Sequence, residues 1–226
     1  MKQKYLYKYR AIENLDRDLA MIANDSFFAA GITDLNDDQE CFLDGQLFVN
    51  SLQILLKIFP GNKHSVENVK MAFEEYVSCR DKVGIFSLSK NPCVGMMWAL
   101  YASMRRGYCI IYNKDALLKA PSSVYMNDRL MLEVKYSRQA PKADLRDISK
   151  GKLPQKLFGS KEAGWSAEEE IRIVTDRFGM QRLVPSALHG IIFGSKMSDK
   201  DKDKIKDTLK NRNVCFYQLQ RKKNDY

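Results

Sequence analysis

Apolar and polar residues alternate along several short segments, as β-strands require. Near the N-terminus, Tyr5, Tyr7 and Tyr9 would share one face of a strand, with Lys8 and Arg10 on the other. Short runs rich in β-branched and aromatic residues between turn residues predict further strands. These lie at 83–89, 108–113, 130–136, 168–175, 182–184, 190–194 and 214–219.

Helical spacing of apolar residues predicts helices between these strands. Asn14 can cap one helix, which carries Leu15 and Leu19 on one side. Ser65 can cap a second helix over 65–80. Further helices are predicted at 50–59, at 95–104 and after Ser198.

The order of these elements predicts an α+β fold. No stretch repeats with a fixed period and no Ser/Gly/Pro-rich linker divides the chain, so we expect a single domain over 1–226 with a mixed, largely antiparallel β-sheet and inserted helices. The basic segment 196–226 forms a C-terminal helix and strand of that domain. The segment 138–164, with prolines, glycines and many charges, is predicted to be a long loop with one helical turn.

Composition restricts the function without defining it. The 37 basic and 28 acidic residues give a net charge of +9, which favours an anionic, phosphate-bearing partner, although a merely soluble basic protein is the alternative. The five cysteines form no C-x-x-C pair, and only two histidines are present, so we expect a reducing compartment and no metal site. Without an apolar leader or a run long enough to span a membrane, a cytoplasmic location is expected.

Several familiar motifs are absent from the sequence. It contains no G-x-G-x-x-G, no Walker loop, no H-E-x-x-H and no G-x-S-x-G. Rossmann dehydrogenases, P-loop NTPases, zincins and α/β-hydrolases are therefore disfavoured.

Polar side chains at the ends of two predicted strands are candidates for ligand binding. A guanidinium fixed on a strand, as predicted for Arg10, can grip a diphosphate or a ribose, and a structural salt bridge is the alternative. Ser87 and Ser89 would point to one side at the end of their strand, where hydroxyls can orient the amide or sugar of a ligand. Serines also end strands without any such role.

A pair of glutamates provides candidate chemistry. On a strand over 168–175, Glu168, Glu170 and Arg172 would share one face, with the two carboxylates about 7 Å apart. Two carboxylates beside an electron-poor sugar carbon suit glycosyl transfer, because its transition state resembles an oxocarbenium cation. The alternative is a surface strand on which Glu170 and Arg172 form a salt bridge.

Two aromatic residues could stack on a ligand. Tyr101 follows Met97 and Trp98 at helical spacing, which usually indicates core, yet its ring could stack on a nicotinamide or a nucleobase. Trp165 precedes the glutamate pair after the long loop. It is predicted to be a lid or stacking residue, or else to anchor the loop to the core.

Longer motifs resemble a known family along nearly the whole chain. L-Y-K-Y-R, L-N-D-D, M-W-A-L-Y-A followed by R-G-Y-C-I-I-Y, and W-x-x-E-x-E-I-R followed by G-I-I-F-G resemble the bacterial domain-of-unknown-function family 2971. That family usually has N-D-P where this chain has Asn36-Asp37-Asp38, and often a histidine where this chain has Arg106.

A second resemblance suggests an activity. Arg10, Ser87-Leu88-Ser89 and Glu168-Glu169-Glu170 are similar, in order, to the R-S-E signature of ADP-ribosyltransferases. This resemblance implies a split sheet whose cleft binds NAD, with Arg10 supporting the ribose or diphosphate and Ser87 the nicotinamide ribose. It implies that Glu170 holds a ribose hydroxyl and stabilises the cation, and that Glu168 orients or deprotonates the acceptor.

The expected activity is therefore cleavage of the nicotinamide–ribose bond of NAD and transfer of ADP-ribose to a macromolecular acceptor, either nucleic acid or protein. Such an enzyme could be a toxin or an anti-phage defence effector, with a possible antitoxin or regulatory partner. The alternative is a non-enzymatic module that binds nucleic acid or a partner through its basic tail and exposed aromatic residues, with the glutamates as surface ion pairs.

Overall fold

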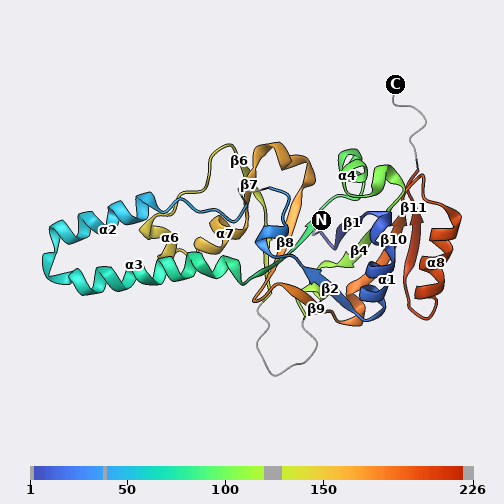
Figure 1. The fold of residues 1–226 in the computed structure, drawn as a ribbon, viewed down its shortest axis with the longest axis horizontal. Coiled ribbons are helices and arrows are strands. Elements are labelled where there is room, and N and C mark those ends of the chain that lie inside the picture. The colour runs from blue at the N-terminus through green and yellow to red at the C-terminus, as the bar shows by residue number, and fades with distance from the viewer. Residues whose placement is uncertain (1–2, 38–39, 120–128, 221–226) are drawn as a thin grey trace.

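The computed structural model describes residues 3–37, 40–119 and 129–220, which form helices and strands around one large sheet (Figure 1). The strands are β1 (Tyr5–Arg10), β2 (Ser26–Ala29), β3 (Gly84–Ser89), β4 (Tyr108–Asn113), β5 (Leu130–Glu133), β6 (Lys135–Ser137), β7 (Ser160–Glu162), β8 (Glu170–Thr175), β9 (Gly179–Arg182), β10 (Leu188–Phe193) and β11 (Cys215–Gln218). The α-helices are α1 (Leu15–Ala23), α2 (Gln46–Ile58), α3 (Lys63–Ser78), α4 (Gly95–Leu100), α5 (Lys114–Leu117), α6 (Leu145–Ser149), α7 (Leu153–Phe158) and α8 (Asp199–Leu209).

The large sheet has seven strands in the order β11-β10-β4-β1-β3-β8-β5. Its neighbouring strands run antiparallel except β10 and β11, which are parallel. Two small sheets, antiparallel β2–β9 and parallel β6–β7, accompany it. The prediction of an α+β fold with a mixed, largely antiparallel sheet is therefore confirmed.

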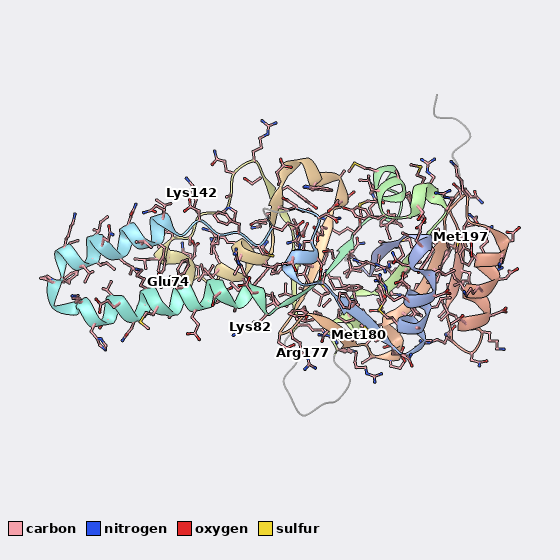
Figure 2. All side chains as sticks on the ribbon, in the orientation of Figure 1. Glu74, Lys82, Lys142, Arg177, Met180 and Met197 are labelled. Carbon is pink, nitrogen blue, oxygen red and sulfur yellow. The ribbon has the colours of Figure 1, made fainter. Side chains whose placement is uncertain are left out.

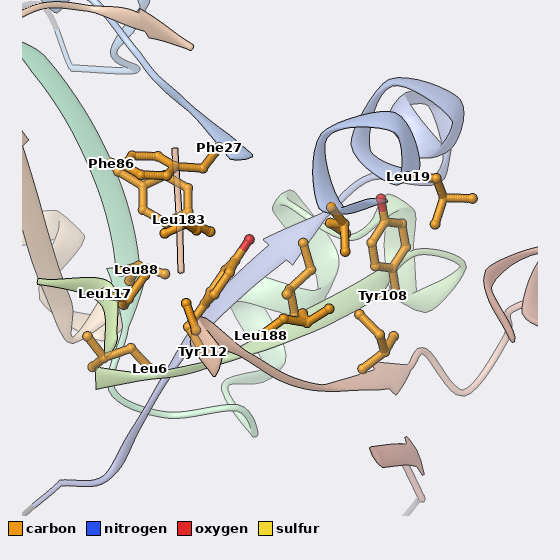
Figure 3. Close-up of a cluster of buried hydrophobic side chains, with 14 of the residues drawn as sticks. Leu6, Leu19, Phe27, Phe86, Leu88, Tyr108, Tyr112, Leu117, Leu183 and Leu188 are labelled. Carbon is orange, nitrogen blue, oxygen red and sulfur yellow. The ribbon is translucent and has the colours of Figure 1, made fainter. Parts of the chain in front are cut away.

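The strands of this sheet place apolar side chains on both of its faces in turn. Helices therefore cover both faces. On one face, Leu6 of β1 joins a core cluster with residues of α1 and α8, and Phe27 of β2 lies against Phe86 of β3 (Figure 3). On the other face, Tyr9 of β1 packs edge-on against Trp98 of α4. A third cluster joins the β3–β8–β5 part of the sheet to α2, α3 and α7, and α2 and α3 project from the sheet as a hairpin (Figure 1).

The large sheet opens between its two central strands. β1 pairs with β4 at every one of its residues, and β3 pairs with β8 in the same way. Among the described residues, however, the register between β1 and β3 contains a single position, Tyr7 opposite Ser89. Farther along β3, Ile85 instead exchanges backbone hydrogen bonds with Ala30, which follows β2. The sheet is therefore split beyond that position, where the residue after β2 pairs with β3 instead of β1.

One of the predicted helix starts is wrong and one is right in position only. α1 begins at Leu15, directly after Asn14 as predicted, but the side chain of Asn14 makes no capping hydrogen bond, and residues 12–14 form a 3₁₀ turn before the helix. α3 begins at Lys63, so that Ser65 lies inside the helix instead of capping it. The predicted cap at Ser198 is confirmed, since its side chain accepts from the backbone N–H of Asp201.

The other differences between the predicted and the observed elements lie in segments where the pattern of apolar residues is weak. The segment 138–164 is not one long loop, since it contains α6, α7 and β7. The sequence reading predicted no strand at β2, which has only four residues and pairs with the equally short β9. β8 begins at Glu170 instead of at Glu168, because Glu169 has a left-handed backbone with φ 47° and follows a 3₁₀ helix over Ala163–Glu168.

No helix within the described residues combines the length and the apolar character needed to cross a bilayer.

Candidate functional site

A cavity of about 670 Å³ lies where β1 and β3 separate. Its walls come from both strands, from α1 and β2, and from the chain just before and at the start of β8. Six of the seven predicted site residues line it: Arg10, Ser87, Ser89, Tyr101, Glu168 and Glu170. The seventh, Trp165, is not among the lining residues. The split therefore brings side chains from distant segments to one place.

Arg10 does not project freely into this cavity. Its Nε donates to Asp18 Oδ2 at 2.5 Å and its Nη2 donates to Asp18 Oδ1, which is a bidentate ion pair. Asp18 is buried and also accepts from the hydroxyl of Tyr108 at 2.7 Å. The structural salt bridge that the sequence left open for Arg10 is thus present, although the residue still lines the cavity.

Lys8 lies on the same side of β1 as Arg10 and reaches across the split. Its ammonium donates to the backbone carbonyl oxygen of Ser87 at 2.8 Å and lies 5.1 Å from the centre of the Phe86 ring. Burial and the neighbouring charge of Arg10 lower the pKa of Lys8 from 10.5 to about 8. β1 therefore brings two cations to the cavity, of which Arg10 is paired with Asp18.

The two serines of β3 have different partners. The hydroxyl of Ser89 bonds to the backbone of Asn91, as expected of a serine that ends a strand. The hydroxyl of Ser87, by contrast, contributes to lowering the pKa of Glu170. Ser87 is therefore the serine that influences the charge of this glutamate.

A buried cluster of charges also lines the cavity. Lys161 of β7 lies at its centre, with its ammonium 2.6 Å from Glu168 Oε2, 3.2 Å from Glu170 Oε2 and 3.0 Å from Glu40 Oε1. Burial alone would lower the pKa of Lys161, but the three carboxylates raise it above its usual value. Lys161 therefore remains an ammonium and holds together glutamates from three parts of the chain.

Arg172 of β8 is the second cation of this cluster. Its Nε donates to Glu170 Oε1 at 2.9 Å, its Nη2 donates to Glu40, and its Nη1 donates to the carbonyl oxygen of Phe158. Burial would raise the pKa of Glu170, but Arg172 and Lys161 outweigh that effect and lower it to about 2. Glu170 is therefore ionised at neutral pH and cannot act as a general acid. The salt bridge between Glu170 and Arg172 that the sequence left open is therefore present, but it is buried instead of lying on a surface strand.

The cluster is not electrically balanced. It contains three carboxylates, of Glu40, Glu168 and Glu170, and two cations, Lys161 and Arg172. Burial raises the pKa of Glu40 against the opposing effect of Arg172 and Lys161, as expected for the carboxylate that is hardest to keep charged. An excess of negative charge at a cavity wall can stabilise a cation that develops on a bound ligand.

Tyr101 links two sequence motifs to this cluster. Its hydroxyl donates to Glu168 Oε1 at 2.6 Å and accepts from Nδ2 of Asn36 at 3.0 Å. Burial and the adjacent Glu168 raise its pKa. The L-N-D, W-A-L-Y and W-x-x-E-x-E motifs thus meet through three hydrogen-bonding side chains. Asp38, where the chain departs from the N-D-P pattern, lies outside the described residues.

The two tryptophans occupy different environments. Trp98 is fully buried, and its indole N–H donates to the carbonyl oxygen of Pro92 at 2.8 Å, so it belongs to the core. Trp165 is half-buried, with Lys161 Nζ 5.0 Å from its ring centre. Its contact is therefore with the charge cluster, and a role as lid or stacking residue stays a prediction.

Sequence reasoning missed three charged residues of the site: Asp18, Glu40 and Lys161. Asp18 lies three positions after Leu15 and directly before Leu19, follows two charged residues of α1, and resembles any solvent-facing helix residue. Glu40 and Lys161 lie in segments interpreted as turn and loop, and no local pattern marks them. Among the residues that the structure describes, no group of His, Cys, Asp and Glu is arranged to hold a metal ion.

The described chain thus belongs to the α+β proteins, with a polar cavity in a split, largely antiparallel sheet. A family model described as "Protein of unknown function (DUF2971)" matches residues 97–173, from α4 into β8. This match supports the family resemblance and includes Tyr101, Glu168 and Glu170, but not Arg10 or the serines of β3. Neither the curated proteins nor the solved structures include a match to this chain.

Proposed function

We propose that this protein is an ADP-ribosyltransferase-like enzyme that cleaves the nicotinamide–ribose bond of NAD and transfers ADP-ribose to a macromolecular acceptor, a nucleic acid or a protein. The observation that carries the proposal is that Arg10, Ser87 and Glu170, from three strands of a split sheet, line one cavity. A volume of about 670 Å³ lies within the range of ligand-binding pockets, roughly 300–1,000 Å³.

The charges around the cavity suit the two ends of such a substrate. Lys8 and Arg10 line the cavity and can supply positive charge to a diphosphate. Glu168 and Glu170 also line it and can supply negative charge to the nicotinamide ribose, where positive charge would develop. The cavity thus offers both kinds of charge that such a substrate needs.

The proposed reaction needs negative charge more than it needs an acid. The bond between ribose C1′ and the nicotinamide nitrogen breaks, and its electron pair leaves with nicotinamide, whose ring becomes neutral. The ribose is left with oxocarbenium character, which the ionised Glu170 stabilises. A nucleophile of the acceptor then forms a bond to C1′ and loses its proton, which Glu168 is positioned to receive once it releases the Tyr101 hydroxyl.

Nicotinamide release tests this proposal. The wild-type protein should release nicotinamide from NAD and should melt at a higher temperature when NAD is present, because a ligand that prefers the native state stabilises it. Glu170→Gln should abolish release and keep the fold. Glu74→Gln, on the projecting hairpin (Figure 2), is the matched control and should leave release unchanged. Unchanged release by Glu170→Gln would remove the assignment.

One observation favours the alternative, a module that binds nucleic acid or a partner without catalysis. Each carboxylate of the cluster is already paired with Lys161 or Arg172, as in a purely structural network. This alternative predicts salt-sensitive binding of nucleic acid that survives Glu170→Gln, with no effect of NAD on melting. Release of nicotinamide by the wild-type protein would exclude it.

A further inference from the structure

Lys8 differs from the other cations of the cavity wall. Arg10 and Arg17 lie beside Asp18, and Lys161 lies among three glutamates. Within the part of the chain that the structure describes, Lys8 has no carboxylate within 4.0 Å of its ammonium. The side chain is nevertheless partly buried.

The position of this ammonium is fixed by contacts across the split. It donates one hydrogen bond to the carbonyl oxygen of Ser87 and lies beside the Phe86 ring. An ammonium has three N–H groups, so this carbonyl leaves donors for a ligand in the cavity that Lys8 lines. Lys8 is therefore preorganised as a donor.

An ammonium that is removed from water without a counter-ion is unfavourable. The low pKa of Lys8, about 8, has this origin, with burial as the main cause and Arg10 as the second. Glu170, Asp18 and Glu168 act in the opposite direction from a distance and do not restore the usual value. An anionic ligand would supply the missing partner.

We propose that Lys8 binds the phosphate or diphosphate group of the ligand that occupies this cavity, and that Arg10 acts as a positioning residue whose guanidinium is held by Asp18. This inference rests on the proposed function, since the diphosphate of NAD is the anion that the ligand would bring. It assigns the phosphate contact to a residue outside the R-S-E signature.

Calorimetry with two ligands separates this inference from the proposed function. Inorganic pyrophosphate probes the anion site alone, and NAD probes the whole cavity. Lys8→Met keeps the length of the side chain and removes its charge. Lys4→Met makes the same change on an exposed residue that does not line the cavity and is the matched control.

We expect Lys8→Met to weaken the binding of both NAD and pyrophosphate about 10- to 100-fold, the effect of losing one charged hydrogen bond, and Lys4→Met to change neither. If NAD binds the wild type and Lys8→Met equally well, the role of Lys8 is overturned and the proposed function stands. If pyrophosphate binding depends on Lys8 but NAD does not bind, the proposed function fails and the anion site stands. If the wild type binds neither compound, both are overturned.

Chemical labelling of the wild-type protein gives a second readout that needs no variant. An amine-reactive acetylating reagent at pH 8 should modify Lys8 readily, because about half of it is unprotonated near its pKa. Pyrophosphate should lower the labelling of Lys8 several-fold and leave that of Lys4 unchanged, as measured by mass spectrometry. Equal labelling of Lys8 with and without saturating pyrophosphate would contradict the assignment.

Discussion

Arg172 and Glu170 lie two residues apart on β8, and the Nε of Arg172 donates to Glu170 Oε1 at 2.9 Å with both side chains buried. Strand alternation puts them on one face, so that this contact follows directly from their spacing. Removal of one member of a buried ion pair leaves the other charge without compensation, which costs more than the pair contributes.

Arg172→Met should therefore destabilise the protein strongly, because Glu170 and Glu40 would lose one of the two cations that they share. We expect the free energy of unfolding to fall by about 3–5 kcal/mol, as measured by urea denaturation. The control is Lys70→Met, which removes an exposed pair with Glu74 and should cost less than about 0.5 kcal/mol. Equal effects of the two substitutions would contradict a structural role for the buried cluster.

Tyr101→Phe tests the link between the motifs. It removes the hydroxyl that joins Asn36 to Glu168, and should lower the free energy of unfolding by about 1–2 kcal/mol. Tyr76→Phe is a matched control, because the buried hydroxyl of Tyr76 has no hydrogen-bond partner among the described residues. Tyr76→Phe should leave the free energy of unfolding unchanged or raise it, as measured for both variants by thermal or urea denaturation. A loss equal to that of Tyr101→Phe would contradict the prediction.

Gly107→Ala should disturb the start of β4. A Cβ at this position would lie 2.1 Å from the carbonyl oxygen of Arg10, a backbone atom that has no room to move away. We expect a loss of at least about 2 kcal/mol in the free energy of unfolding. Gly61→Ala, where a Cβ would meet nothing within 4 Å, should have little effect, and circular dichroism melting distinguishes the two.

The pKa of Lys8 predicts a pH dependence of stability. The folded pKa is about 8 and the unfolded value is 10.5, so between these values the unfolded chain binds more protons at this site. The free energy of unfolding of the wild type, minus that of Lys8→Met, should therefore rise as the pH increases from 8 to 10.5. Arg10, Asp18, Glu168 and Glu170 face this group in both proteins, so their contributions largely cancel in the difference. A flat difference across this range would contradict the low pKa.

The strands of the large sheet could be predicted where apolar residues dominate both faces. The prediction of a strand at 108–113 matches β4, because each of its first five residues is buried. The short strands β2 and β9 carry too few residues for a pattern, and their pairing depends on contacts distant in sequence. The 3₁₀ helix before β8 was missed because the periodicity of a strand continues through Glu168 and Glu169 in the sequence but not in the backbone.

The residues of the candidate site could be predicted only where they lie on strands with a clear pattern. Arg10, Ser87 and Glu170 lie on strands that the sequence pattern locates, although β8 begins two residues later than predicted. Lys161 and Glu40 have no such marker, since their burial results from the packing of loops around β8. The sequence identified Glu168, Glu170 and the cation Arg172 that pairs with Glu170, but not Lys161, which contacts both glutamates.

The single register position between β1 and β3 leaves few backbone hydrogen bonds to fix the spacing of these strands beside the cavity. Residues of β2 and α1 also line this cavity, so substitutions there can change its size while the ladders of β1 with β4 and of β3 with β8 are kept. The framework therefore leaves the size of the ligand space open to redesign.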